Sequence, residues 1–412
     1  MDSTVIALYL ALGIIIMAAR VAGSVARQLG QPRVLGELIV GVLLGPTLLD
    51  MLHSSALGLR EAHLETAIAE LAELGVLLLM FNVGLNVHFK ELLEVRTVAG
   101  VAGVAGAVLP VAMTVPVVMA FGFTWQAGLL AGVTLAATSV SISAQVLLEL
   151  GVLRTKEGNA LLATALVDDV VAILLVSLAL AVTAPQGNVE PAALVEIVLR
   201  MALYIGVAFA LAWFGLPAFI GWVHRRADGQ PYAVAAFALV LALLFGWSAA
   251  QFGGVAAITG AFIAGVGLSR VREHIKRQID VAVSNIAYVF LVPIFFVSVG
   301  LQTDLHNFPL SALPFAALLL AIAVISKIAG CGLGARLSGF NNTESFRLGV
   351  CMISRGEVGL IIAALGLSTG FFRPGDALFP SLFLVILLTT VLTPPLVRRV
   401  FQPALSPMAE ES

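Results

Sequence analysis

The sequence predicts an all-α protein that crosses a membrane many times, and its composition and the length of its apolar runs are the main reasons. Of its 412 residues, 60% are hydrophobic and only 11% are charged, whereas an ordinary soluble domain has about 25% charged residues. The apolar runs are far longer than strands and lack their alternation. A helix needs about 20 apolar residues to cross about 30 Å of hydrocarbon. The chain therefore holds about a dozen spans and no sizeable domain outside the membrane.

We expect thirteen membrane-spanning helices, and each follows an apolar run. Their approximate limits are 4–22, 34–50, 67–86, 97–121, 125–150, 159–184, 194–222, 232–252, 254–270, 281–302, 310–335, 344–370 and 376–397. The first run follows Met-Asp-Ser-Thr without a basic segment, so we expect it to remain as a helix rather than to be cleaved as a signal peptide.

The positively charged residues predict the orientation of these spans, because Lys and Arg accumulate in cytoplasmic loops. With thirteen spans, most of the 22 Lys and Arg residues fall on the side of the C-terminus, and the opposite loops contain only Arg60 and Arg373. We therefore expect a multi-pass protein of the inner (cytoplasmic) membrane, with its N-terminus outside and its C-terminus in the cytoplasm.

Charge and cysteine content exclude several other classes. The formal net charge is -2 and no run of like charges occurs, so we expect no nucleic-acid partner. Cys331 and Cys351 both lie inside apolar runs, which predicts neither a disulfide framework nor a thiolate metal site.

Two motifs recur in the two halves of the chain. The spacing Gly-x-x-Ile-x-Gly-Val-x-Leu occurs at residues 36–44 and 260–268, and Val-Gly-Leu followed by an amide residue occurs at 83–86 and 299–302. Both matches relate one span to the seventh span after it. An odd offset reverses the direction in which the second copy enters the membrane. We therefore expect an inverted-topology repeat of spans 1–6 and 8–13, an architecture typical of secondary transporters.

Such repeats place the substrate site near the middle of the membrane, on discontinuous helices in matching positions. The matching spans are 125–150, with Thr138 and Ser139 near its middle, and 344–370, with Arg355 and Glu357. Hydroxyls and charges there can satisfy the backbone groups that unwinding frees. We expect these two helices to be broken and crossed. The alternative for 125–150 is an intact helix whose hydroxyls bond back to its own carbonyls.

Three further ionisable residues lie deep in predicted spans. Asp168 and Asp169 are adjacent in 159–184, and Lys327 lies in 310–335. A charged residue at this depth costs about 2.5–3.5 kcal/mol on insertion scales. Neighbours on a helix point about 100° apart, so one carboxylate can pair with Lys327 while the other faces a water-filled cavity. The alternatives are acids that serve only helix packing, and a lysine that snorkels to the membrane surface.

A carboxylate in such a cavity can hold either a proton or a small hard cation. Competition for one site would exchange the two ions. Oxygens from the break in 125–150 would complete the coordination of the cation.

Six ordered segments together resemble the cation:proton antiporter-2 family, and within it the bacterial Na+/H+ antiporters of the paired-Asp type. They are 35–46 (LGELIVGVLLGP), 71–75 (LAELG), 137–140 (ATSV), 167–170 (VDDV), 326–327 (SK) and 354–360 (SRGEVGL). The resemblance runs from about residue 30 to residue 397.

The resemblance implies roles for individual residues. Asp169 is similar to the ion-binding carboxylate of the family and Asp168 to the acid that pairs with Lys327; both would hold the transported Na+ or the proton. Thr138 and Ser139 correspond to the break in the fifth span and supply further oxygens to the ion. Arg355 and Glu357 correspond to the break in the twelfth span.

The resemblance also implies a homodimer that works by an elevator movement. Within a single transporter domain, 1–402, it assigns dimerisation to 4–86 and 232–302 and ion translocation to 97–184 and 310–397, joined by 194–222. We expect 403–412 to be a short cytoplasmic tail, and no attached nucleotide-binding regulatory domain. An Asp-Asp pair is associated in this family with electrogenic exchange of two protons per cation.

The function predicted from the sequence is thus electrogenic Na+(Li+)/H+ antiport by a secondary transporter that is not an enzyme, needs no cofactor and contacts membrane lipids. K+/H+ antiport on the same scaffold remains the alternative, because cavity size and dehydration cost choose the ion. A cation channel is disfavoured because a lysine beside the site repels cations. An intramembrane aspartyl protease is disfavoured because its two acids must face each other from different helices, whereas Asp168 and Asp169 diverge on one helix.

Overall fold

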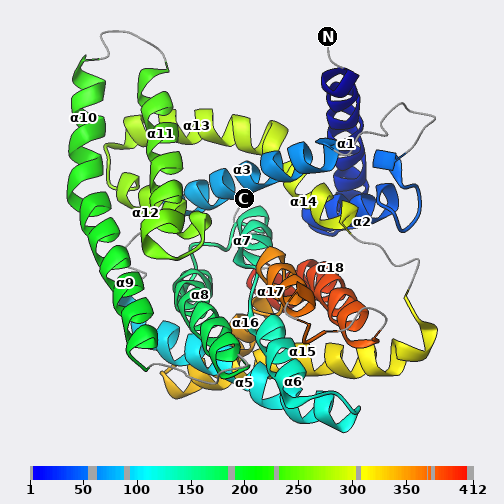
Figure 1. Cartoon of the computed structure of the whole chain (residues 1–412). Coiled ribbons are helices and arrows are strands. Elements are labelled where there is room, and N and C mark those ends of the chain that lie inside the picture. Colours follow the sequence, from blue (N-terminus) through cyan, green and yellow to red (C-terminus); the bar gives the residue numbers. More distant parts are fainter. Residues whose placement is uncertain are drawn as a thin grey trace. The chain divides into compact units, whose positions relative to one another are not determined.

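The computed structural model is helical throughout the residues it describes, which are 3–53, 63–87, 93–183, 191–226, 232–302, 308–368, 370–372 and 376–405 (Figure 1). The helices of the first half are α1 (Ser3–Gln28), α2 (Arg33–Leu44), α3 (His63–Asn86), α5 (Arg96–Ala120), α6 (Trp125–Ala136), α7 (Val140–Glu149), α8 (Lys156–Thr183) and α9 (Pro191–Ala210). Those of the second half are α10 (Leu216–Arg226), α11 (Ala233–Ser248), α12 (Ala257–Leu268), α13 (Glu273–Ile286), α14 (Val292–Leu301), α15 (Leu313–Leu337), α16 (Asn342–Cys351), α17 (Glu357–Ser368) and α18 (Leu378–Leu405).

Short segments of other helix types complete the chain within the described residues. Three π-helical turns, Leu211–Gly215, Ala249–Gly253 and Ala287–Leu291, join α9 to α10, end α11 and join α13 to α14. Two 3₁₀ turns, Met51–His53 and Leu310–Ala312, lie before α3 and α15.

The membrane-protein class predicted from composition is confirmed. Ten helices of the described part are long and apolar enough to cross a membrane, and Ala257–Leu268 is a shorter apolar helix. The expected number of thirteen is not confirmed by this count. Arg60 and Arg373, on which the predicted orientation depends, and residues 406–412 of the predicted tail lie outside the described residues.

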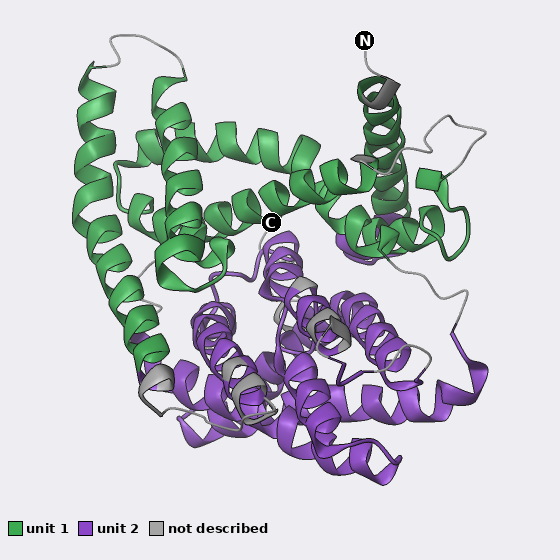
Figure 2. Cartoon of the chain, viewed as in Figure 1, with its two compact units in different colours: residues 1–25, 36–91, 196–304 green, residues 26–35, 92–195, 305–412 purple. Residues whose placement is uncertain are grey.

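The chain forms two compact units, which Figure 2 colours separately. Unit 1 comprises Met1–Val25, Gly36–Glu91 and Glu196–Asp304, and unit 2 comprises Ala26–Leu35, Leu92–Val195 and Leu305–Ser412. The assignment of dimerisation and translocation to separate parts of the chain stays a prediction.

Unit 1 is held together by close helix packing at the glycines of the recurring motifs. Gly41 of α2 lies against Gly300 of α14, and Gly84 of α3 lies against Gly265 of α12. A Cβ atom on any of these four glycines would overlap the backbone of the facing helix. Small residues permit this approach in membranes, where packing rather than the hydrophobic effect joins helices. The two motifs are thus the contact surfaces of these helix pairs.

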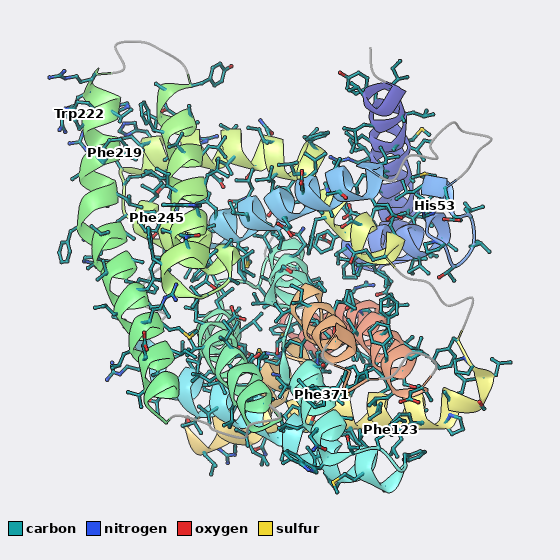
Figure 3. All side chains as sticks on the ribbon, in the orientation of Figure 1. His53, Phe123, Phe219, Trp222, Phe245 and Phe371 are labelled. Atoms are coloured by element: carbon teal, nitrogen blue, oxygen red, sulfur yellow. The ribbon has the colours of Figure 1, made fainter. Side chains whose placement is uncertain are left out.

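The outer surface of α9 and α10 in unit 1 is apolar and exposed. Phe219 and Trp222 stack with ring centroids 6.1 Å apart on α10 (Figure 3), and Phe214 in the turn before it is 75% exposed. A membrane-spanning segment presents such a surface to hydrocarbon.

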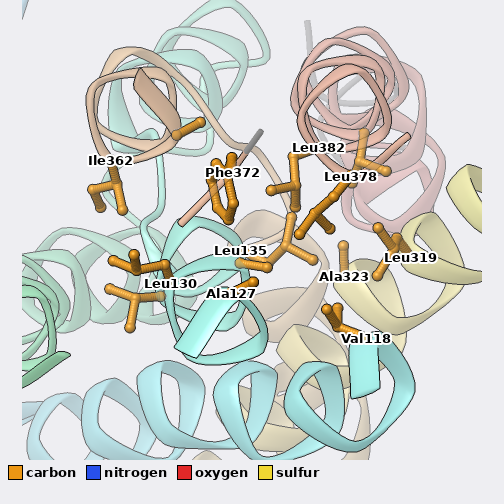
Figure 4. Close-up of a cluster of buried hydrophobic side chains, with 14 of the residues drawn as sticks. Val118, Ala127, Leu130, Leu135, Leu319, Ala323, Ile362, Phe372, Leu378 and Leu382 are labelled. Carbon is orange, nitrogen blue, oxygen red and sulfur yellow. The ribbon is translucent and has the colours of Figure 1, made fainter. Parts of the chain in front are cut away.

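Unit 2 has its own apolar core, built by α5, α6, α15, α17 and α18. Leu130 and Leu135 of α6 pack with Leu319 of α15, Ile362 of α17 and Leu382 of α18, all buried (Figure 4). Phe372, just after α17, closes the cluster. This core fixes the positions of α6, α15 and α17, which carry or adjoin the polar site described next.

Candidate functional site

The fifth and twelfth predicted spans are both interrupted near their middle. The first break separates α6 from α7 at residues 137–139, where Ala137 and Ser139 have extended backbone angles. The second separates α16 from α17 at residues 352–356. Thr138, Ser139 and Arg355 lie in these breaks, and Glu357 is the first residue of α17; its side chain lies outside the described residues.

The two breaks bind each other through backbone and hydroxyl groups. The Ser139 N–H donates to the Ser354 carbonyl at 2.9 Å, and the Ser354 hydroxyl donates to the Ser139 carbonyl at 2.6 Å. The Ser143 hydroxyl donates to the Cys351 carbonyl at 2.5 Å. These bonds satisfy groups that unwinding would leave unpaired in the membrane. The two half-helix pairs are thereby joined at a single crossing.

Arg355 supplies a fixed positive charge at that crossing. Its side chain is 0% exposed and donates to the carbonyls of Leu135 at 2.8 Å, Ala323 at 2.9 Å and Ile353. Leu135 lies at the C-terminal end of α6 and Ile353 just beyond that of α16. Helix C-termini carry partial negative charge. The guanidinium therefore compensates two half-helix ends that meet away from water.

Asp168 of α8 and Lys327 of α15 form a buried ion pair. Lys327 Nζ lies 2.8 Å from Asp168 Oδ1, and the two side chains are 0% and 1% exposed, respectively. Arg355 also attracts Asp168 electrostatically. The second oxygen, Oδ2, is buried without a hydrogen-bond partner among the described residues. A buried pair of this kind is stable only while both charges are present, because either one alone keeps its desolvation cost.

Asp169 has a different environment from its neighbour. It follows Asp168 on α8 and is partly exposed, whereas Asp168 is buried. The divergence of adjacent helical side chains explains the difference. Thr138 and Ser139 are both buried; the Thr138 hydroxyl lies 3.5 Å from the Ala136 carbonyl and the Ser139 hydroxyl 3.2 Å from that of Ser141.

Sequence reasoning missed two residues that shape the crossing. Ser354 links the breaks but was recognised only as part of a motif, and Thr390 of α18 donates its hydroxyl to the Arg355 carbonyl. Hydroxyls near the middle of an apolar span were the available signal, and they recur in the Thr389–Thr390 pair. Among the described residues, no group of three or more His, Cys, Asp or Glu side chains is placed to hold a metal ion.

A partly exposed carboxylate next to a buried ion pair, in a helical bundle with two interrupted spans, is typical of membrane transporters of ions. The comparisons with known proteins narrow this class. Residues 14–402 match the protein family described as "Sodium/hydrogen exchanger, transmembrane". The Na(+)/H(+)-K(+) antiporter GerN of Bacillus cereus is 33% identical over 95% of both chains, and a Na(+)/H(+) antiporter of Enterococcus hirae is 30% identical over 92% of this chain and 94% of its own.

The fold agrees with a solved structure of the same class. The sodium proton antiporter MjNhaP1 from Methanocaldococcus jannaschii has a TM-score of 0.69 at 16% identity, covering 98% of each chain. The protein belongs to the family of transmembrane sodium/hydrogen exchangers. It is a cation/proton antiporter of the membrane, and therefore a secondary transporter rather than an enzyme.

Two ion pairs connect the start of α8, the helix that carries Asp168 and Asp169, to α16. Arg347 Nη1 lies 2.8 Å from Glu157 Oε1 with both side chains largely buried, and Lys156 Nζ lies 3.0 Å from the more exposed Glu344. Arg347→Gln is expected to destabilise the protein by about 3 kcal/mol, because it strands a buried carboxylate. Lys156→Gln, the control, is expected to cost less than about 1 kcal/mol. Thermal unfolding in detergent measures both. Equal losses of stability in the two variants would show that the buried Arg347–Glu157 pair does not stabilise the protein more than the exposed pair does.

Proposed function

We propose that the protein exchanges Na+ or Li+ for protons, and that the proton and the cation compete for the Asp169 carboxylate. The observation that supports this most directly is the unequal environment of the two adjacent acids. Asp168 is buried and neutralised by Lys327, while Asp169 is partly exposed. The neutralised acid cannot readily take up a second cation. Asp169 is therefore the carboxylate of the pair suited to binding and releasing ions.

In this proposal the helix breaks complete the site. Na+ and Li+ are hard cations that prefer oxygen ligands, as other hard cations do. Hydroxyl and carbonyl oxygens of Thr138 and Ser139 supply such ligands without adding charge. Asp168 can add only its second oxygen, Oδ2, to a cation that Asp169 binds, because Lys327 occupies Oδ1. Arg355 stays fixed at the half-helix ends and keeps their dipoles from attracting the cation elsewhere.

Competition for one carboxylate makes the exchange obligatory. The proton and the cation each neutralise Asp169, whereas the empty site is anionic and crosses the low-dielectric membrane at high cost. The loaded forms therefore change their access far more readily than the empty form. We further propose electrogenic exchange of two protons per cation, which the ion pair of Asp168 and Lys327 next to Asp169 supports.

The remaining parts of the proposal concern movement and assembly. We place the moving part in residues 97–184 and 310–397 and the contacts of a homodimer in 4–86 and 232–302, with alternating access by an elevator movement in the inner membrane. The excess of Lys and Arg on the side of the C-terminus supports a cytoplasmic C-terminus and an outside N-terminus.

K+/H+ exchange is a second candidate. It is favoured by the 33% identity to GerN, whose printed name includes K(+) beside Na(+) and H(+). The same carboxylate chemistry serves either ion, and the dehydration cost of the ion against the size of the site decides between them.

Reconstitution in liposomes tests the proposal. With an imposed pH gradient and the potential clamped, Na+ and Li+ are expected to drive proton movement at lower concentration than K+. Releasing the clamp and imposing an inside-negative potential should change the rate, because net charge moves in each cycle. Half-saturation by K+ at or below that of Na+ would replace the first candidate by the second. A rate that is insensitive to the potential would exclude the two-proton stoichiometry.

A further inference from the structure

A cavity of about 350 Å³ lies beside the last turns of α18, outside the ion site. It is lined by Gln31, Pro395, Leu396, Arg398, Arg399 and Gln402. All six residues belong to unit 2. Ligand sites in proteins are typically about 300–1,000 Å³. The volume is thus sufficient for a small polar group, and none of the six lining residues is acidic.

Among the described residues, no acidic side chain pairs with the positive charge of this cavity. Neither Arg398 nor Arg399 forms an ion pair within the part of the chain that the structure describes. Glu149 is an acid near this region, but it accepts the backbone N–H of Arg33, the first residue of α2, at 2.8 Å. It is not among the residues that line the cavity. Two guanidinium groups therefore line the cavity together with the amides of Gln31 and Gln402.

Gly30 determines how closely one of these arginines approaches the turn between α1 and α2. Its φ of +69° is in the left-handed region, and an added Cβ atom would lie 2.9 Å from both Nη atoms of Arg398. Glycine at this position therefore allows the guanidinium to lie directly on the turn. The Arg398 side chain accordingly lies against the turn and is only partly exposed.

The position of the two arginines in α18 sets their depth. The stretch 377–397 contains no Asp, Glu, Lys or Arg, and Arg398 and Arg399 follow it directly. About 20 uncharged residues cross the hydrocarbon layer, so the arginines lie at the level of the lipid headgroups. Basic pockets between helices at that level bind anionic headgroups, and the planar guanidinium matches a phosphate group with two parallel hydrogen bonds.

We propose that this cavity is a binding site for the phosphate group of an anionic membrane lipid. Arg398 and Arg399 bind the phosphate oxygens, and the acyl chains extend along the apolar turns of α18 next to Pro395 and Leu396. A lipid bound in this way joins the end of α18 to the α1–α2 turn. The proposal depends on the membrane location of the chain and not on which ion it transports.

Native mass spectrometry of the purified full-length protein, titrated with phosphatidylglycerol or phosphatidylcholine, tests the site. The wild type is expected to bind phosphatidylglycerol at least tenfold more tightly than phosphatidylcholine. The variant R398Q/R399Q should lose at least tenfold of that affinity. The matched control R225Q/R226Q removes two adjacent arginines at the end of α10 and should lose less than threefold. Equal losses in the two variants would show general electrostatic attraction and would overturn the proposal.

Two further measurements test whether the guanidinium groups recognise the ligand and whether the ligand is a lipid or free phosphate. R398K/R399K keeps both charges and removes the forked geometry, and an affinity between those of the wild type and R398Q/R399Q is expected; affinity equal to that of the wild type would argue against recognition by the guanidinium groups. Inorganic phosphate should displace the lipid only weakly. Displacement by free phosphate as effective as by phosphatidylglycerol would assign the site to soluble phosphate and overturn the lipid proposal.

Discussion

Asp169→Asn is expected to abolish cation/proton exchange while leaving the protein folded. Asparagine has nearly the shape of aspartate but neither accepts a proton nor supplies negative charge to a cation. Asp169 is partly exposed on α8, and its neutral replacement removes a charge from the membrane, so folding should not suffer. Proton movement driven by Na+ in liposomes should fall to the level of protein-free vesicles.

The matched control is Asp280→Asn in unit 1. Asp280 is also a partly exposed helical acid, and its Oδ1 lies 3.4 Å from both Asn86 Nδ2 and Ser284 Oγ. Asparagine can keep these contacts, so exchange by this variant should stay close to that of the wild type. Sodium-dependent proton release retained by Asp169→Asn would assign the ion-carrying carboxylate to another residue.

Breaking the Asp168–Lys327 pair should have the second largest effect. Asp168→Asn leaves a buried ammonium group without its carboxylate, and loss of one partner of a buried pair costs about 3–5 kcal/mol. Lys327→Gln leaves a buried carboxylate without its ammonium group and should cost a similar amount in stability. Lys327→Gln should also weaken the dependence of exchange on voltage, since it removes a positive charge next to the site.

A double-mutant cycle separates pairing from the other contacts of these side chains. The variant Asp168→Asn/Lys327→Gln has two neutral partners and should be more stable than Asp168→Asn alone. Thermal unfolding in detergent measures stability, and exchange currents measured at several clamped potentials report on voltage dependence. If the two single changes add without coupling and voltage dependence is unaltered, the pair is a packing feature and Lys327 has no part in transport.

The sequence was sufficient to locate both helix breaks, because polar residues within long apolar runs are costly and therefore conspicuous. Ser139 and Arg355 lie in the interruptions that the polar segments predict. The hydrogen bonds that join the two breaks could not be predicted from the sequence. The carbonyl acceptors of Arg355, such as those of Leu135 and Ala323, belong to apolar residues, and no side-chain pattern marks a backbone acceptor.

Helix ends were the least predictable part of the fold. The sequence places the start of one span at residue 281, whereas α13 begins at Glu273 with a charged turn whose Ile275 and Ile279 are buried. Similarly, α18 continues past the expected end at residue 397 to Leu405. Charged residues end an apolar run, yet they do not end a helix that extends beyond the hydrocarbon, where they are solvated.

The contacts of Arg200 in unit 1 could not be predicted from the sequence either. Its place near the end of a span favours snorkelling from sequence alone. In the structure its guanidinium donates to the carbonyls of Phe252 at 2.6 Å and Gln251 at 2.9 Å, at the end of the π-helical turn after α11. The unsatisfied carbonyls of that helix end attract it, and nothing in the spacing of the sequence reveals this contact.

The dependence of Na+ binding on pH tests most directly whether one carboxylate hosts both ions. Calorimetric titration of the purified protein with Na+ across a pH series should show an apparent affinity that weakens on the acidic side by at least about tenfold per pH unit, as competition with a proton requires, and by up to about a hundredfold where both protons of the proposed stoichiometry are released. Protons should be released on Na+ binding, and Asp169→Asn should remove both effects. An affinity for Na+ that stays constant with pH, with no proton release, would contradict the account.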